Sequence, residues 1–457
     1  MLAKDQTDPE WAWSPYRPDP KRPWNLARAG HLYRRAAFGA NWDQLQQAVA
    51  EGPQRTVDRL LTPEGDVAAF NEKFDRYEAA SSGSDSADGL RPWWLMRMMQ
   101  SPHPVLEKMT FFWHAHFAVS SAKVKNSGMM HHYVKQLRGE ALGRFDSMLA
   151  GLSHDPAMLL ARDAAANRKS LPCEHVPREF MVRTCLGTGH FSESDVREAA
   201  RAFTGWFVLQ GRVRFIPREP DPGVKRILGQ QGNFDDSDVV RLLLQQPATP
   251  RLLVRKLYRL LISETDEPGD ALVEPLAESF AAEYDIGALV GRMLGSNLFF
   301  SPAAYRRRIK SPLEFALGIV KGLEATVSAV QLGQDLAGLG QNLYEPPTAD
   351  GWPGGRQWIN GATSLGRSNL AFSLLDSQKP YEGKLDPMAI AQKHGHSAGE
   401  SAGRFLLDLF LQGDLDDAVQ QSVLKHALGE AAPDGDPSQA VRRLAHLVVT
   451  LPEFQLA

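Results

Sequence analysis

The stretch that decides the fold is EKMTFFWHAHFAVS, residues Glu107–Ser120, in which an aromatic run carries two histidines one residue apart. Residues three and four positions apart lie on the same side of a helix, and here one such side is almost entirely apolar. That side, extended one turn back, consists of Val105, Met109, Phe112, Trp113 and His116. The stretch therefore predicts a helix that is buried along one face.

The two histidines, His114 and His116, allow two interpretations. On a continuous helix their side chains lie about 200° apart, so one metal ion cannot bind both. If the helix ends near Trp113, an extended backbone turns both imidazoles the same way, and the β-branched, serine-rich segment FAVSSAKV favours such an ending. Alternatively, His116 is a hydrogen-bonded core residue and His114 lies at the surface.

Helical periodicity extends over most of the remaining chain. The longest periodic segments are residues 236–246, 249–263, 271–284, 311–330 and 401–427. The exception is WFVLQGRVRFIP, Trp206–Pro217, where two short β-prone runs flank Gln210–Gly211 and predict a hairpin. We therefore expect an all-α fold, a large single multi-helical body with one small β-hairpin near residues 206–217.

Composition also predicts the domain organisation. Residues 1–24 are rich in proline and tryptophan, which favours an extended arm lying on the body. Residues 25–457 are expected to form a single helical domain, within which the small and polar residues 79–89 read as a flexible linker.

Overall composition excludes several classes of function. The 457 residues are 43% hydrophobic and 23% charged, with a formal net charge of -3, so no bulk charge indicates nucleic acid or an anionic membrane as a partner. No window approaches the ~18 apolar residues of a membrane span, and the N-terminus shows no secretory signal, so the chain as written is expected to be cytoplasmic. Cys173 and Cys185 form neither a disulfide framework nor a CxxC motif. Any metal is therefore expected to be bound by nitrogen and oxygen atoms.

A second cluster of ionisable residues lies between Cys173 and Trp206. Pro177 fits the first position of a helix that would run to about Leu186. Ser192 and Asp195 have the spacing of a capping box at the start of the next helix, so N-capping is one role for Asp195. For Glu179 a structural alternative is an ion pair with Arg183 or Arg178.

Five motifs in order give the chain a specific resemblance to a known family. They are FFWHAHFAVS, REFMVRTCLGTGHFSESDVREAARAFTGW, DPGVKRILGQQG, IKSPLEFALG and PPTADGWPGGRQWIN. Over residues 25 to 375 the chain resembles the large bacterial DUF1800 family, domain of unknown function 1800. The resemblance implies a mostly helical body, often exported and often encoded beside a second uncharacterised family, and it brings no established activity.

The match to the family pattern is incomplete at two places. His114, His116 and Phe117 match its HxHF motif, whereas Cys173–Glu179 retains only Glu174, Arg178 and Glu179 of the family's usual Asn-Glu-Asn-Tyr-Ala-Arg-Glu. Where family members usually carry a His-Asp pair, this chain has Pro220 and Asp221. If that histidine is functional in the family, this chain is an altered member, or His175 compensates.

These residues suggest two kinds of chemistry. Imidazoles with carboxylates bind zinc, manganese or non-haem iron, so His114, His116 and Glu179 are candidate metal ligands, supported by Asp195 or Asp221. A metal-free alternative uses His114 or His116 as a general base, oriented by Glu179, with Arg178 binding an anionic group.

Two further segments have alternative roles. The cationic segment YRRRIK, Tyr305–Lys310, could bind phosphate or a polyanion. Because the chain as a whole is nearly neutral, we instead expect a solvent-exposed cationic turn. In the loop 344–361, Trp352 and Trp358 suit stacking on a sugar or insertion into the body, and we favour insertion.

The sequence thus supports two functional hypotheses. One is a metal-dependent enzyme, an oxidoreductase or hydrolase, acting on an unknown small molecule. The other is a non-catalytic binding or assembly protein, whose polar motifs hold helices together while the Trp/Gly loop or the N-terminal arm contacts a protein partner.

Overall fold

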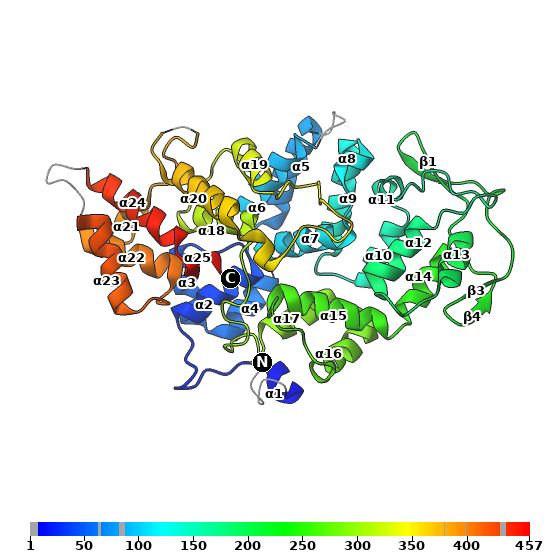
Figure 1. Cartoon of the computed structure of the whole chain (residues 1–457), viewed down its shortest axis with the longest axis horizontal. Coiled ribbons are helices and arrows are strands. Elements are labelled where there is room, and N and C mark those ends of the chain that lie inside the picture. The colour runs from blue at the N-terminus through cyan, green and yellow to red at the C-terminus, as the bar shows by residue number, and fades with distance from the viewer. Residues whose placement is uncertain (1–7, 63–64, 82–86, 379, 398, 430–435) are drawn as a thin grey trace.

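The structure, a computed structural model, describes residues 8–457 apart from 63–64, 82–86, 379, 398 and 430–435. Helices dominate the described residues, which otherwise contain two small antiparallel sheets (Figure 1). The all-α fold class predicted from the sequence is therefore confirmed. No helix in this part of the chain combines the length and apolarity needed to cross a bilayer.

The first part of the chain forms twelve α-helices and a π-helix. Several begin at a side-chain cap, as where Asn25 and Asn41 accept hydrogen bonds from the first turns of their helices. The helices are α1 (Pro9–Trp13), α2 (Leu26–Ala36), α3 (Trp42–Glu51), α4 (Pro53–Leu61), α5 (Val67–Ser81), α6 (Leu90–Gln100), α7 (Pro104–Phe117), α8 (Ser121–Val124), α9 (Ser127–Glu140), α10 (Phe145–Ser153), α11 (Pro156–Ala161), α12 (His175–Glu179) and the π-helix η2 (Phe180–Cys185).

The second part adds the strands and the remaining helices. They are α13 (Glu193–Ala202), β1 (Trp206–Leu209), β2 (Arg212–Phe215), β3 (Lys225–Ile227), β4 (Gln230–Gly232), α14 (Asp236–Leu244), α15 (Ala248–Leu261), α16 (Asp270–Glu283), α17 (Ile286–Leu294), α18 (Pro312–Gly322), α19 (Ala329–Gly338), the 3-10 helix η3 (Gly355–Trp358), α20 (Gly361–Leu375), α21 (Pro387–Lys393), α22 (Gly399–Leu411), α23 (Asp417–Gly429), α24 (Pro437–Thr450) and α25 (Pro452–Gln455).

The predicted hairpin is present as β1 and β2. It turns at Gln210 and Gly211, whose φ angles of 50° and 76° match the two left-handed positions of a type I′ turn. A second hairpin, β3–β4, turns in the same way at Leu228 and Gly229. The sequence did not predict it, because strands of three residues leave almost no alternating pattern.

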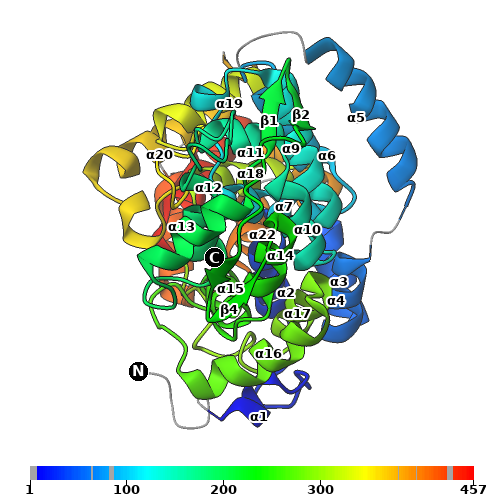
Figure 2. The same cartoon turned by 90° about the vertical axis from the view of Figure 1, so that its right-hand side faces the viewer.

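Helix α7 lies near the middle of the molecule. Figure 1 shows α20–α24 towards one end and α10–α14 with the two hairpins towards the other, with α15–α17 below. Figure 2, turned by 90°, shows α5 on the outer edge and α1 beside α16. α7 packs against α2, α4, α6, α9 and η2, so both of its long sides are in contact with other helices.

The expectation that the helix ends near Trp113 is wrong. α7 continues to Phe117 and stops where Ala118 adopts a left-handed conformation, with φ 47°. Helical hydrogen bonding persists because the apolar side chains through Phe117 remain buried against neighbouring helices. Consequently the two histidines project about 200° apart, as on any continuous helix.

Other boundaries also differ from the predictions. The helix expected from Pro177 begins at His175, and after Glu179 it changes to the π-helix η2. Neither of the segments 311–330 and 401–427 is one helix: the first contains α18 and the first two residues of α19, and the second contains parts of α22 and α23. The second division falls at Gln412 and Gly413, whose φ values of 54° and 83° are incompatible with a continuing helix.

The N-terminal residues differ from a purely extended arm. Asp8 caps α1, and Pro9 occupies its first position. Trp13 is buried, and its indole N–H donates to the Leu272 carbonyl of α16 at 2.8 Å. Of the linker expected at 79–89, residues 79–81 belong to α5, 82–86 lie outside the described residues, and 87–89 form a turn into α6.

Candidate functional site

A cavity of about 300 Å³ lies beside α7 and is bounded by four segments of the chain. Side chains of α7 spaced by one and two helical turns form one wall. The second wall is α15 with Glu264 beyond its end, the third is Arg308–Glu314, and the fourth is the loop Asp350–Trp358. The HxHF, IKSP and DGWPGG motifs of the family resemblance therefore meet at one cleft, which we call the α7 cleft.

His116 faces this cleft in contact with Lys256 of α15. The Lys256 ammonium donates to Nδ1 of His116 at 3.0 Å and to the Arg183 carbonyl of η2 at 2.8 Å. Because a lysine ammonium only donates, Nδ1 accepts and the proton of the neutral ring resides on Nε2. His116 is 6% exposed, and its Nε2 has no partner in hydrogen-bond geometry among the described residues, although the Thr184 backbone lies nearby.

Burial shifts the titration of both partners. Burial, reinforced by the charge of Lys256, lowers the pKa of His116 well below its ordinary value. Burial also lowers the pKa of Lys256 to about 8, against the opposing influence of Asp350 and Glu179. A neutral imidazole thus lies beside an amine that loses its proton near physiological pH.

His114 lies on the other side of α7, away from the cleft. Its ring is fully buried among Trp94, Tyr133, Tyr344 and Trp352, with ring centroids 5.4 to 5.8 Å away. Neither ring nitrogen has a hydrogen-bond partner among the described residues, and burial lowers its pKa to about 3. The alternative that placed His114 at the surface is therefore wrong.

Glu179 is buried between two arginines. Arg162 contacts one carboxylate oxygen at 3.0 Å and Arg183 the other at 3.3 Å, which confirms the ion pair with Arg183. Arg178 instead pairs with Glu174 and Glu193 near the surface. Glu179 therefore reaches the α7 cleft only indirectly, through Arg183, whose carbonyl binds Lys256.

The proposed metal ligands do not gather around one point. Among the described residues, the group of three metal-ligating side chains with ligand atoms within 4.8 Å is Asp43, Glu324 and His394, where Lys393 already pairs with both carboxylates. His114 lies in an aromatic enclosure, and both oxygens of Glu179 are held by arginines. In this arrangement the donor set His114, His116 and Glu179 does not fit one metal ion. Metal binding by these residues is supported by the sequence alone.

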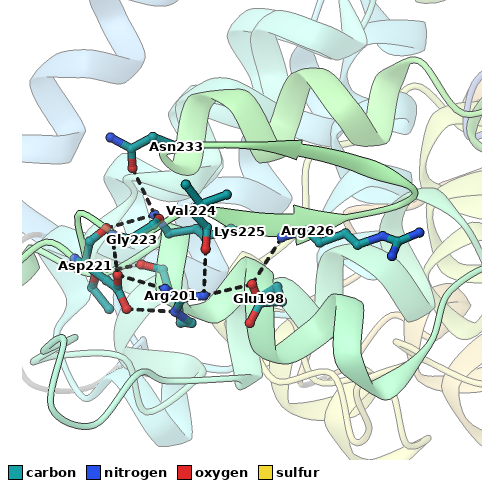
Figure 3. Close-up of polar contacts among 9 residues, drawn as sticks. Glu198, Arg201, Asp221, Gly223, Val224, Lys225, Arg226 and Asn233 are labelled. Carbon is teal, nitrogen blue, oxygen red and sulfur yellow. Dashed lines mark hydrogen bonds and ion pairs between the residues drawn. The ribbon is translucent and has the colours of Figure 1, made fainter.

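Asp195 and Asp221 lie where α13 meets the second hairpin, and Figure 3 shows the contacts of Asp221. Asp195 completes the capping box with Ser192, and its other oxygen accepts from the Leu228 amide at 2.7 Å, so the N-capping role is confirmed. The Arg201 guanidinium binds both oxygens of Asp221, at 2.8 and 3.0 Å. That pairing holds the pKa of Asp221 below its usual value, and both aspartates serve local structure.

His175 also has a local partner. Its Nδ1 lies 3.1 Å from the Arg162 carbonyl, and the side chain is 60% exposed. The chain positions Pro220 against Gly205, whose missing side chain leaves room for the proline ring. That His175 compensates for the histidine that the family pattern has before Asp221 stays a sequence-based prediction.

The third wall of the cleft contains a buried charge network. Glu314 binds the ammonium of Lys108 and both terminal nitrogens of Arg308. Burial alone would raise the pKa of Glu314, but Arg308 and Lys108 hold it well below its usual value. The solvated turn expected at Tyr305–Lys310 is therefore wrong, because Arg308 is paired and Lys310 is buried.

The tryptophan loop closes the cleft over α7. Trp352 stacks on Phe111 with centroids 5.2 Å apart, and Trp358 is buried, as insertion into the body predicts. Gly351 has φ +85°, and a side chain there would lie 2.6 Å from the Ala115 carbonyl. Only glycine brings the loop this close to the helix segment between the two histidines.

Sequence reasoning missed Lys256, Glu264 and Trp352 as neighbours in one site. Lys256 carried a usable signal, because it lies three residues after Leu253 and four before Leu260, at the border of an apolar helix face. Glu264 carried none, since its burial depends on the loop that covers it. Burial raises the pKa of Glu264, and Arg308 opposes that shift.

Comparison with known proteins gives a family without an assigned activity. The family model described as "Protein of unknown function (DUF1800)" matches residues 31–456. No curated protein matches the chain, and no solved structure does.

Proposed function

The chain belongs to the DUF1800 family of proteins of unknown function, and we propose that its α7 cleft binds a small anionic molecule and performs acid–base chemistry on it. The observation that carries the proposal is the contact of His116 with Lys256 at a cavity wall. A buried imidazole with an unpartnered nitrogen and an amine of lowered pKa are typical of a reactive site.

The charge of Lys256 supports an anionic ligand. Its hydrogen-bond partners are neutral, namely an imidazole and a carbonyl, and no carboxylate of the described residues lies within ion-pair distance of it. By contrast, Lys108 and Arg308 in the same cleft both form ion pairs with Glu314. A half-buried ammonium without an ion-pair partner among the described residues favours binding of an anion.

The aromatic walls support a ligand that also has an apolar part. Phe111, Phe112, Trp352 and Trp358 line the cleft together with the polar groups. Small-molecule sites are commonly built this way, with apolar surface for affinity and few polar groups for orientation.

The proposed chemistry uses His116 without a metal ion. The Lys256 ammonium passes a proton to Nδ1 of His116 as the Nε2–H of the same ring passes to a bound ligand, so the imidazole stays neutral, and the reverse transfer restores both groups. This modifies the metal-dependent hypothesis, in which His114 and Glu179 complete the site. It gives His116 the general acid–base role and gives His114 none.

The test is binding of small anions by wild type and two variants. We expect one or more members of a panel of small carboxylates and phosphates to raise the melting temperature of the wild type and of Lys425→Met, an exposed control. Lys256→Met should fold but lose that response. If the anions stabilise all three proteins equally, the proposal is wrong, and the non-catalytic alternative gains support.

A further inference from the structure

The Lys256 side chain could react covalently as well as bind an anion by its charge. As a neutral amine it carries two hydrogens and one lone pair. Both hydrogens have acceptors already in place, the Arg183 carbonyl at 2.8 Å and His116 Nδ1 at 3.0 Å. The lone pair is therefore the unused position on a nitrogen whose residue lines the cavity.

Burial favours the neutral form of the Lys256 amine. Lys256 projects from α15 to His116 of α7 and the Arg183 carbonyl of η2, and this burial outweighs the nearby carboxylates of Asp350 and Glu179, which favour the ammonium. Burial brings the pKa of Lys256 to about 8, so about a quarter of it is unprotonated at pH 7.5. Lysines desolvated beside another cation are the ones that act as nucleophiles on carbonyl groups.

We propose that Lys256 forms an imine with the carbonyl group of a small anionic aldehyde or keto acid bound in the α7 cleft. This inference rests on the proposed function, since it uses the same cleft, and it adds the substrate class and a covalent step. His116 is the proton carrier of that step.

The step balances without an oxidant or a reductant. The amine lone pair forms a bond to the carbonyl carbon, and the π electron pair moves to the oxygen. Nδ1 of His116 takes a proton from the nitrogen and returns it to that oxygen, giving a neutral carbinolamine. The remaining N–H proton of the carbinolamine then passes through Nδ1 of His116 to the hydroxyl oxygen, the C–O bond breaks with release of water, and the nitrogen electron pair forms the C=N bond of the neutral imine.

The competing explanation is that Lys256 only ties α15 to α7 and η2. Its two hydrogen bonds do join these elements, so a loss of stability on mutation cannot distinguish the roles. Covalent trapping can distinguish the two roles. A purely structural lysine held by two hydrogen bonds should be modified more slowly than an exposed lysine, whereas an imine-forming lysine should be modified faster.

The experiment uses glyoxylate as the probe and sodium cyanoborohydride as the trap. The full-length protein is treated briefly near pH 7.5, and each lysine's modification is measured by peptide mass spectrometry. We expect Lys256 to be modified about tenfold faster than the exposed Lys425. Modification of Lys256 at the same rate as Lys425, or slower, overturns the inference.

Two variants make the result specific. Lys256→Arg keeps a cation but cannot form an imine, so it should remove the fast site. His116→Gln keeps an acceptor beside Lys256 but cannot carry a proton, so trapping should slow by about tenfold or more. If His116→Gln is trapped as fast as wild type, the proton-carrier role is wrong.

The two proposals fail separately. Anion binding that depends on Lys256 without preferential trapping contradicts the imine alone and leaves the proposed function standing. Absence of both contradicts the two together.

Discussion

At the scale of single residues, a two-residue spacing on α7 gives two histidines opposite environments. His116 reaches a cleft and a lysine, whereas His114 is enclosed by four aromatic rings without a hydrogen bond to either nitrogen. A buried polar group without a partner destabilises a fold by about 1–3 kcal/mol, so His114 is costly where it stands.

We therefore predict that His114→Phe leaves the free energy of unfolding within about 1 kcal/mol of wild type or raises it. An aromatic ring is kept among the four aromatic neighbours, and no hydrogen bond to a described residue is lost. Chemical denaturation measures the effect, and the anion response should persist. A loss of a bound transition metal on this change would instead support the metal hypothesis.

Asp155 gives a prediction about pH. It caps α11 while buried, its Oδ2 has no partner among the described residues, and burial raises its pKa to about 6. The folded state therefore binds a proton more tightly than the unfolded state does. Its contribution to stability is fully present below the unfolded pKa near 3.8 and is lost as pH rises through about 6.

Wild type should accordingly gain stability relative to Asp155→Asn on acidification from pH 7 to pH 5, by up to about 1.4 kcal/mol per unit below the folded pKa. Urea denaturation of both proteins at each pH measures the difference. Parallel stability curves over this range would show that Asp155 is not the group that titrates.

At the scale of elements, local patterns account for what the sequence could predict. The apolar face of α7 and the β1–β2 turn depend on residues that are close in sequence, so periodicity and turn preference predict them. The change to a π-helix at Phe180 leaves no periodic signal, and the pairing of Lys256 with His116 spans 140 positions. Such features depend on tertiary contacts that a single sequence does not display.

The tryptophan loop offers a test at this scale. Gly351→Ala should destabilise the fold by about 1–3 kcal/mol, because the backbone there has φ +85° and the new methyl group meets the Ala115 carbonyl. Gly361→Ala is the matched control, since its position at the start of α20 opens into free space. Thermal unfolding compares them, and equal effects would contradict the close approach of loop and helix.

At the scale of the whole molecule, segments far apart in sequence are joined by a few buried contacts. Trp13 connects the N-terminal residues to α16, and Leu456 pairs with Ile309 beside the third wall of the α7 cleft. The cleft is therefore assembled from parts of the chain that must all be in place at once.

We predict that Trp13→Ala lowers the free energy of unfolding by about 3–5 kcal/mol, since a buried indole and its hydrogen bond are removed. Phe372→Ala, at a side chain 59% exposed, should change it by less than about 0.5 kcal/mol. Guanidinium denaturation separates the two. A small effect at Trp13 would show that the N-terminal contact adds little to the fold.

The π-helix η2 sets a constraint on how this protein can vary. A π turn accommodates one residue more than an α turn, so deleting a single residue within Phe180–Cys185 would restore regular helical phase. The same deletion would rotate the segment before it by about 100° relative to the segment after it. Glu179 and the Arg183 carbonyl that binds Lys256 would then no longer both face their present partners. The extra residue of the π turn and the geometry of the α7 cleft are therefore expected to be kept or lost together.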